Sequence, residues 1–342
     1  MDRRDFLAGA AALALAPREL LAAAPPRRIA LATADLEAHV VAVDLATGAV
    51  VERIHTHAYP RSIETVGACA VVCHSELGIV SVLDARSLHV VHVLRGFDEP
   101  RYTAAHPDGR HAYVTDAERG EVVLLDVLAG RVLARERVGP LARHIAIDRA
   151  ARHLWIALGS KAREITLVAL DGTRPHAKHT FSPPSRGHDV GFAPDGRHAW
   201  ISSGEGRELA VYDLPTRRVV ARPPAGLPPQ HVTFSNDRAF VTSGWSGSLQ
   251  VHTLGGRALA SVPVPVGSYN VQHADGIVVT PALGHGQLTT VTLGGHVIRS
   301  EKVARSSHDA CVAEAAARAP AADTPGSRPG TSRASAVPPA AA

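Results

Sequence analysis

The sequence predicts an all-β fold, a seven-bladed β-propeller of four-stranded antiparallel blades whose ring is closed by pairing of the N- and C-terminal segments. Three observations support this prediction. A phrase recurs at a fixed spacing, the apolar runs alternate as strands do, and no long stretch keeps a 3.6-residue period beyond the start of the chain.

The recurring phrase is a Pro-Asp-Gly-Arg-His turn followed by a short apolar run. It reads Ala-Tyr-Val-Thr after the copy that begins at Pro107 and Ala-Trp-Ile-Ser after the copy that begins at Pro194, 87 residues later. A degenerate copy of the phrase covers Asn236–Thr242. The spacing corresponds to two units of just over 40 residues, and repeats of about 40–45 residues are typical of propeller blades.

Each unit contains four short runs separated by Gly, Pro and Asp, which is the signal for four strands. The chain holds seven such units, because the pattern of the second strand recurs seven times. It begins near Ile29, Ala68, Arg110, Arg152, Arg197, Arg238 and Ile277. In the third unit the runs are residues 112–115, 121–126, 131–138 and 144–148, the last leading into the next unit.

The register of the repeat also predicts how the ring closes. The chain begins its first unit at residues 28–33, which match a second strand of the repeat. The innermost strand missing from that unit is supplied by residues 307–313 at the far end. Such pairing removes two exposed strand edges that would otherwise invite aggregation.

The Ala-Tyr-Val-Thr phrase beside a Pro-Asp-Gly turn resembles the YVTN-type β-propeller repeat family, a WD-like repeat. The resemblance covers roughly residues 28–313 and has its clearest motifs in the two full copies of the phrase. It implies a seven-bladed, usually exported propeller. It implies no single activity, because one fold hosts many functions.

The two ends of the chain differ from the repeats. Residues 1–24 form an export signal, with Arg3-Arg4 before Phe6-Leu7, an apolar run over 8–16 and alanines at 22–24, and the paired arginines resemble a twin-arginine leader. The propeller is assigned to residues 25–315, and the Ala/Pro/Ser-rich residues 316–342 are expected to be a disordered tail. The protein is therefore expected in the periplasm, on the cell surface or in the medium, with no transmembrane segment in the mature chain.

Composition narrows the partners. The net charge is +4 with basic and acidic residues interspersed, so no nucleic-acid partner is expected, and the chain is taken as a monomer.

Cys69 and Cys73 lie four residues apart in one predicted strand and cannot pair with each other. Two alternatives stay open: Cys311 is linked to one of them, or all three are buried as small hydrophobic residues.

A ring of polar pairs is the predicted site. The innermost strand of every blade starts at the same mouth of the channel, and the residues at these seven positions are polar. Convergent polar groups are the usual sign of a binding site. The ligand-binding candidates are Arg61, Arg101, Tyr102, Arg143, His144, His188, Asp189, His231, Tyr269, His308 and Asp309.

The two sides of this ring suggest different ligands. Arg61, Arg101 and Arg143 come from three consecutive blades and suit carboxylates or phosphates. The other side is rich in histidine and aspartate, which suits a transition metal, with His188, His231 and His308 as the candidate ligands. No other cofactor is assigned.

The favoured function is an exported binding module that recognises a small anionic ligand, a metal or a protein partner at the channel mouth. The alternative is an exported propeller enzyme, either a lactonase or an oxidoreductase similar to the quinoprotein and d1-haem propellers, which would use the mouth histidines. The sequence contains no catalytic motif such as Gly-x-Ser-x-Gly or Cys-x-x-Cys-His, so an enzymatic role is left open. A purely structural surface module is a third alternative. The repeated phrase itself is expected to lie away from the mouth, as scaffold.

Overall fold

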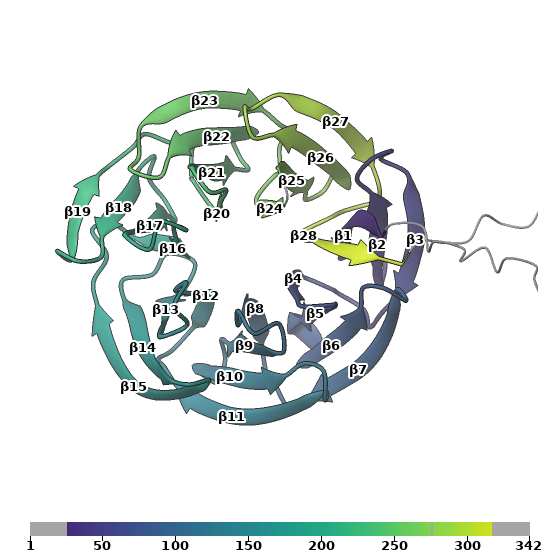
Figure 1. Cartoon of the computed structure of the whole chain (residues 1–342), viewed down its shortest axis with the longest axis horizontal. Coiled ribbons are helices and arrows are strands. Elements are labelled where there is room, and N and C mark those ends of the chain that lie inside the picture. The colour runs from purple at the N-terminus through teal and green to yellow at the C-terminus, as the bar shows by residue number, and fades with distance from the viewer. Residues whose placement is uncertain (1–25, 275, 317–342) are drawn as a thin grey trace, which may run out of the picture. The chain divides into compact units, whose positions relative to one another are not determined.

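Seven four-stranded antiparallel sheets surround a central axis in the computed structural model, which describes residues 26–274 and 276–316 (Figure 1). The predicted seven-bladed β-propeller is confirmed. Blade 1 has the strand order β28-β1-β2-β3, and blades 2 to 7 follow as β4–β7, β8–β11, β12–β15, β16–β19, β20–β23 and β24–β27. The predicted leader lies outside the described residues, and so does the predicted tail apart from Ala316.

The strands of each blade run from the channel outward. The innermost strands are β28 (Ala310–Ala315), β4 (Ser62–Val66), β8 (Pro100–Ala105), β12 (Ala142–Ile147), β16 (Gly187–Phe192), β20 (Val232–Phe234) and β24 (Gln272–Ala274). The second strands are β1 (Arg27–Ala34), β5 (Cys69–His74), β9 (His111–Asp116), β13 (His153–Leu158), β17 (His198–Ser203), β21 (Arg238–Ser243) and β25 (Ile277–Ala282).

The two outer layers complete the blades. The third strands are β2 (His39–Asp44), β6 (Ile79–Asp84), β10 (Glu121–Asp126), β14 (Ile165–Asp171), β18 (Leu209–Asp213), β22 (Ser248–Thr253) and β26 (Gln287–Thr292). The outer strands are β3 (Val50–His55), β7 (His89–Arg95), β11 (Arg131–Arg137), β15 (Arg174–Phe181), β19 (Arg218–Ala221), β23 (Ala258–Pro263) and β27 (Val297–Lys302). A short 3-10 helix, η1 (Ser75–Leu77), follows β5.

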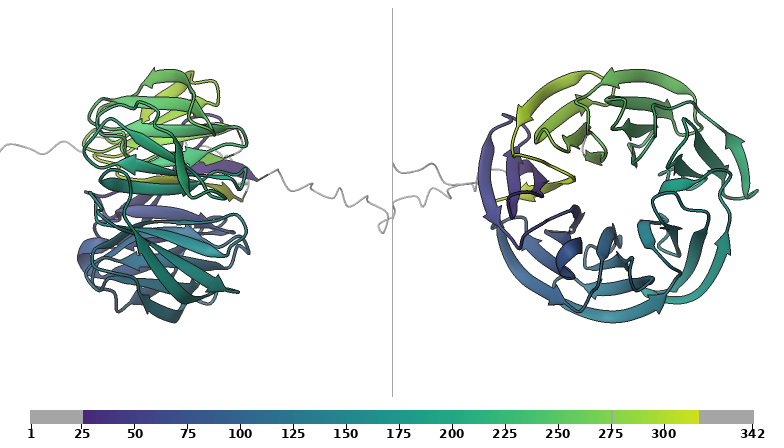
Figure 2. Two further views of the ribbon diagram at one scale, coloured as in Figure 1. Left: turned by 90° about the vertical axis from the view of Figure 1, so that its left-hand side faces the viewer. Right: turned by 180° about the vertical axis from the view of Figure 1, so that it is seen from behind.

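The ring closes as the register predicts. β28 pairs antiparallel with β1, from Arg27 opposite Ala315 to Ala32 opposite Ala310, and the two strands lie side by side in both face-on views (Figures 1 and 2). The Thr33 amide also donates to the Asp309 carbonyl at 2.8 Å. The two ends of the described chain therefore share one blade.

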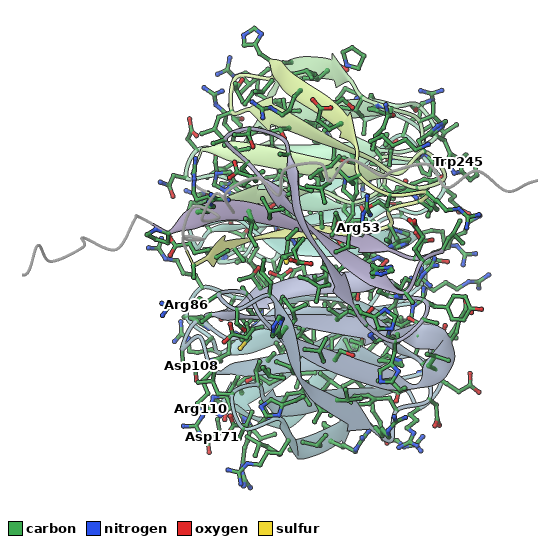
Figure 3. All side chains as sticks on the ribbon, turned by 90° about the vertical axis from the view of Figure 1, so that its right-hand side faces the viewer. Arg53, Arg86, Asp108, Arg110, Asp171 and Trp245 are labelled. Carbon is green, nitrogen blue, oxygen red and sulfur yellow. The ribbon has the colours of Figure 1, made fainter. Side chains whose placement is uncertain are left out.

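The repeated phrase builds a rigid turn on one face of the ring. The Asp108 carboxylate accepts hydrogen bonds from the amides of Arg110 and His111 and binds His111 Nδ1 at 2.6 Å, and Asp195 repeats this pattern with Arg197 and His198. Figure 3 shows Asp108 and Arg110 at one face and Trp245 at the other.

The aromatic residue of the phrase connects each copy to the following blade. Tyr113 Oη donates to the Thr173 carbonyl at 2.7 Å, and Trp200 Nε1 donates to the Leu254 carbonyl at 3.0 Å. In the degenerate copy the Phe240 side chain has no hydrogen-bond donor, and the Arg238 guanidinium instead donates to the Leu293 carbonyl. A buried aromatic group with a polar end suits this position, because it fills the space between blades and satisfies a turn carbonyl.

The three cysteines are free and buried. Cys69 and Cys73 pack in the core between blades 2 and 3, whereas Cys311 packs in the core between blades 1 and 2. Alternate residues of a strand face opposite sides of the sheet. β5 therefore turns Ala70 and Val72 toward Cys311 and turns its two cysteines away from it.

Candidate functional site

The seven polar pairs form two layers at the mouth of the channel. All seven second members line one cavity of about 350 Å³. They are Ser62, Tyr102, His144, Asp189, His231, Asn270 and Asp309. The seven first members do not line this cavity and lie one residue closer to the mouth. They are Arg61, Arg101, Arg143, His188, Gln230, Tyr269 and His308.

Irregular hydrogen bonding between strands changes the direction of the side chains at three of these polar pairs. The register of β8 with β9 shifts between Pro100 and Thr103, around Arg101-Tyr102. Equivalent shifts occur in β12 and β16, around Arg143-His144 and His188-Asp189. A bulge redirects the side chains of the bulged residues. Three consecutive blades therefore depart from strict period-two alternation at their polar pairs.

The last residue of the repeated phrase anchors the mouth. Its hydroxyl reaches the carbonyl of the first pair member in the next blade, as Thr115 Oγ1 does to Arg143 at 2.6 Å. In the described part of the chain, Thr33, Ser202 and Thr242 bind the carbonyls of Arg61, Gln230 and Tyr269 in the same way. The turn of the phrase is thus scaffold on the far face, as expected, but its final residue positions the candidate site.

Three guanidinium groups converge on one side of the mouth. Arg61, Arg101 and Arg143 each have a buried Nε without a hydrogen-bond partner. The Arg101 Nη1 contacts the Glu99 carboxylate at 2.7 Å, and the Arg143 guanidinium lies 5.9 Å from the Tyr102 ring. Burial, together with the nearby Arg101 and Arg61, lowers the pKa of Arg143. The structure therefore collects positive charge here and leaves donors unused.

Strained backbone precedes two of these arginines. Tyr59 has φ 56° and Leu141 has φ 58°, and each lies two residues before an arginine of the mouth. Residues other than glycine rarely adopt positive φ, and such strain collects at binding sites. Both side chains are exposed, so packing of the side chain does not explain the conformation.

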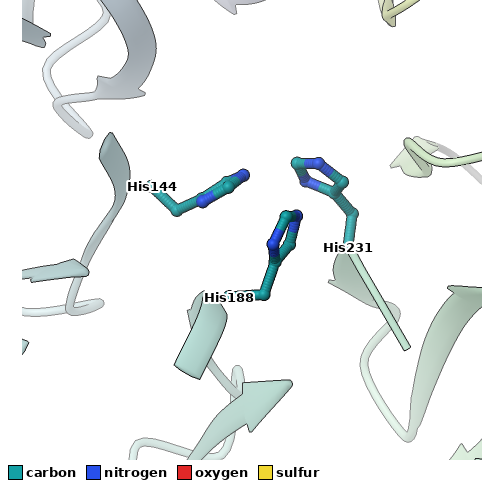
Figure 4. Close-up of side chains that lie close together, drawn as sticks. All are labelled: His144, His188 and His231. Atoms are coloured by element: carbon teal, nitrogen blue, oxygen red, sulfur yellow. The ribbon is translucent and has the colours of Figure 1, made fainter. Parts of the chain in front are cut away.

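Three imidazole rings meet at the channel axis (Figure 4). Nitrogen atoms of His144, His188 and His231 all lie within 4.8 Å of one another. The ring centroid of His144 lies 4.3 Å from that of His188 and 4.8 Å from that of His231, and Tyr102 stacks on His144 at 4.1 Å. His188 Nδ1 donates to the Ser160 carbonyl at 2.8 Å, whereas neither nitrogen of His144 has a partner.

All three rings are held neutral. Burial lowers the pKa of His188 to about 4 and lowers the pKa of His144 and of His231 well below the ordinary value. The neighbouring imidazoles and Arg143 act in the same direction on His144 and His231, because like charges disfavour protonation. The cluster therefore presents lone pairs rather than positive charge.

His308 does not join this cluster. The structure places His144 with His188 and His231, whereas His308 Nδ1 donates to the Arg61 carbonyl at 3.0 Å. Of the three predicted metal ligands, His188 and His231 thus lie in the imidazole cluster together with His144, whereas His308 makes a different contact. His144 was already recognisable as a member of the polar ring, and it lies where the pairing of β12 with β13 is irregular.

The two aspartates of the ring tie neighbouring blades together. The Asp309 carboxylate accepts from the amides of Ala310 at 2.7 Å and Ile63 at 3.0 Å, which links β28 to β4. The Asp189 carboxylate accepts from the amides of Val190 and Val232 and links β16 to β20. Burial raises the pKa of Asp189 to about 7 and raises that of Asp309 well above its ordinary value. These oxygens already have partners and are poor candidates for metal ligands.

Tyr269, the remaining predicted residue, packs away from the cluster. A Cβ on Gly244 would lie 2.1 Å from Tyr269 Cδ1, so the ring rests directly on the backbone of the loop between β21 and β22. Sequence analysis missed Glu64 and Gln272, which line the cavity on β4 and β24. Gln272 Nε2 donates to Glu64 Oε2 at 2.8 Å. The sequence signal for Glu64 was its spacing of two residues from Ser62, because alternate residues of a strand share one face.

Glu64 should make stability depend on pH. Burial raises its pKa from 4.5 to about 7 against the hydrogen bonds from Gln272 and Thr65, and the nearby Asp309 is also ionisable. The folded state therefore binds a proton more tightly than the unfolded state, so the contribution of Glu64 falls as pH rises from about 4.5 to 7. The largest pH-dependent contribution of Glu64 to the free energy of unfolding is about 3 kcal/mol, at 1.36 kcal/mol for each unit of its pKa shift. Because Glu64 is only partly buried, solvent screening reduces this contribution to about 1–2 kcal/mol.

Urea unfolding of Glu64→Gln and the unmodified protein between pH 4 and 8 tests this prediction. The two should agree near pH 4, and the variant should be the more stable above pH 7. A constant difference across this range would contradict the assignment.

The fold and this mouth define a seven-bladed β-propeller with a polar, partly basic channel opening. Among the described residues, no helix is long and apolar enough to cross a bilayer. Neither protein-family models nor curated protein sequences give a match.

Solved structures do resemble the chain. Hydrazine synthase from Kuenenia stuttgartiensis aligns with 15% identity and a TM-score of 0.66, over 75% of this chain and 90% of that one. The dihydro-heme d1 dehydrogenase NirN aligns with 18% identity and a TM-score of 0.59, over 80% of this chain and 63% of that one. A protein of unknown function from Desulfotomaculum acetoxidans aligns with 13% identity and a TM-score of 0.69, over 83% and 98%. At these identities the likeness concerns the fold.

Proposed function

We propose that this chain is an exported β-propeller of the YVTN repeat type that binds a small anion, a carboxylate or phosphate compound, at the mouth of its channel. One observation carries the proposal. Three guanidinium groups from consecutive blades converge there with buried Nε–H donors that have no partner. The Tyr-Val-Thr phrase supports the repeat type, and Arg3-Arg4 in the leader supports export.

The electrostatics of the mouth favour an anion. Among the described residues, Arg101 forms an ion pair with Glu99, whereas Arg61 and Arg143 form none. The histidines beside the three arginines are neutral. A buried donor without a partner is unfavourable by about 1–3 kcal/mol, so a ligand that satisfies these groups gains affinity. Planar guanidinium groups suit the paired oxygens of a carboxylate or phosphate.

Replacement of Arg143 tests the site. Isothermal titration of the full chain with inorganic phosphate, oxalate, malonate and succinate should give one saturable site for at least one anion. Arg143→Gln should weaken that binding about 10- to 100-fold, because a hydrogen bond to a charged group contributes about 1.5–3 kcal/mol. Arg61→Gln should act similarly and the double variant should bind nothing measurable.

Arg53→Gln is the matched control, because Arg53 is exposed on the outer strand β3 (Figure 3). It should bind as the unmodified protein does, and circular dichroism should show that every variant is folded. Failure of all four anions to bind, or equal affinity in Arg143→Gln and the unmodified protein, would refute the proposal.

The enzyme alternative draws on the fold likeness to hydrazine synthase and to NirN, which is described as a dihydro-heme d1 dehydrogenase. A planar macrocycle in this channel would have to displace the three imidazoles, whose centroids lie 4.3–5.6 Å apart across the axis. The residues present therefore fit a haem-type group poorly. We favour the binding function, with a visible absorption spectrum of exported protein as the check.

A further inference from the structure

The imidazole cluster beneath the arginines has the features of a metal site. Three blades deliver one ring each, and a nitrogen of every ring lies within 4.8 Å of the others (Figure 4). The donors come from His144 on β12, His188 on β16 and His231 just before β20. Residues this far apart in sequence meet here because the innermost strands of adjacent blades lie side by side.

The hydrogen bonds leave the required lone pairs free. His188 Nδ1 donates to the Ser160 carbonyl, so its Nε2 carries the lone pair. His231 Nδ1 lies 3.5 Å from Asp189 Oδ2. The backbone partner behind the His188 ring thus fixes that ring, as outer partners of ligating imidazoles do in metal sites.

His144 supplies the second, independent observation. Its side chain is buried and neither ring nitrogen has a hydrogen-bond partner. A neutral imidazole has one donor and one acceptor, and leaving such groups buried and unsatisfied is unfavourable. Stacking with Tyr102 holds the ring in place but satisfies neither nitrogen. An ion at the centre of the cluster would satisfy one of them.

We propose that His144, His188 and His231 bind a divalent first-row transition metal ion, with Zn²⁺ as the reference ion. An all-imidazole donor set suits Zn, Cu and Ni rather than Mg or Ca. Nitrogen ligands 2.0–2.1 Å from a tetrahedral ion are about 3.4 Å apart, so the nitrogens, now within 4.8 Å of one another, would move closer by at most about 1.4 Å on binding. Three protein ligands leave the fourth position for water or a ligand atom.

The arginines above should couple this site to the anion. A dication close to Arg143 is opposed by charge repulsion, which an anion shared between the metal and the guanidinium groups would relieve. This coupling between metal and anion rests on the proposed anion-binding function, whereas the metal site itself does not. Zn²⁺ should therefore bind more tightly in the presence of the preferred anion, and Arg143→Gln should abolish that enhancement while retaining Zn²⁺ binding.

The metal site is tested with tag-free full chain that has been stripped with a chelator. Titration calorimetry should give one Zn²⁺ per chain, and Co²⁺ should give the strong visible band of a low-symmetry, nitrogen-ligated ion. His188→Ala and His231→Ala should each lower Zn²⁺ affinity on the order of 100-fold or more. In the unmodified protein Zn²⁺ should raise the melting temperature, and in these variants it should not.

The chain offers a matched control in the cluster His106, Asp108 and His111 on the opposite face, whose members already bond to one another. His111→Ala should bind Zn²⁺ as the unmodified protein does. Loss of binding in His111→Ala but not in His188→Ala would move the metal to that turn and overturn the proposal. Absence of one-to-one binding to folded protein would also overturn it. If His231→Ala does not fold, His188→Ala decides, because that side chain makes a single hydrogen bond to the backbone.

Discussion

Trp200→Ala should lower the free energy of unfolding by about 3–5 kcal/mol, the range for removing a buried tryptophan. Trp200 is fully buried among Leu209, Val211 and Val241. Its ring also lies 6.1 Å from that of Phe234, and its Nε1 donates to the Leu254 carbonyl. The substitution leaves a cavity between blades 5 and 6 and an unpartnered carbonyl.

Urea unfolding followed by far-UV circular dichroism measures this effect. Trp200→Phe is the control, because it keeps an aromatic ring and removes the N–H donor. That variant should lose only about 1–2 kcal/mol, from one hydrogen bond and a small change in volume. A loss below about 1 kcal/mol in Trp200→Ala would mean that the phrase does not hold adjacent blades together as described.

Asp309→Ala should be the second large effect, with a loss of about 2–5 kcal/mol. The substitution leaves the amides of Ile63 and Ala310 buried without their acceptor, at about 1–3 kcal/mol each. Because β28 closes the ring on β1, the damage should be concentrated where the two ends of the propeller meet. Hydrogen exchange should therefore accelerate most in residues 310–315 and 62–66, the two strands that this carboxylate links, and next in residues 27–34, which pair with β28.

Asp189→Ala is the matched variant for this prediction. Its carboxylate makes the same pair of amide contacts between blades 5 and 6, far from the closing blade. It should lose similar stability but expose β16 and β20 to exchange rather than the terminal strands. Equal protection of residues 310–315 in Asp309→Ala and the unmodified protein would show that this carboxylate does not secure the closure.

The repeated phrase shows which contacts could be predicted from the sequence and which could not. Asp108 and Asp195 bind the turns around them, and such local contacts are readable from a few neighbouring residues. The period then gave seven blades and placed the polar pairs at one mouth. It could not show that the hydroxyl of Thr115 reaches the Arg143 carbonyl, because that contact depends on how adjacent blades pack.

The choice of residues within the polar ring was likewise beyond the sequence. His308 and His144 both belong to the polar ring, yet His308 binds the Arg61 carbonyl and His144 joins the imidazole cluster. Bulges in β8, β12 and β16 interrupt the strand alternation at three of the seven pairs. A bulge shifts the alternation of a strand by one residue, and nothing in the local composition predicts it here.

The sequence by itself determined the blade count, the closing register and the polar ring, because a fixed repeat forces equivalent residues to equivalent places. The tertiary structure decided which ring members are free to bind. Asp189 and Asp309 are occupied by amides of neighbouring strands, whereas the three arginines and His144 keep buried groups without partners. The physical reason is that hydrogen-bond satisfaction depends on contacts between blades, and those contacts join residues far apart in the chain.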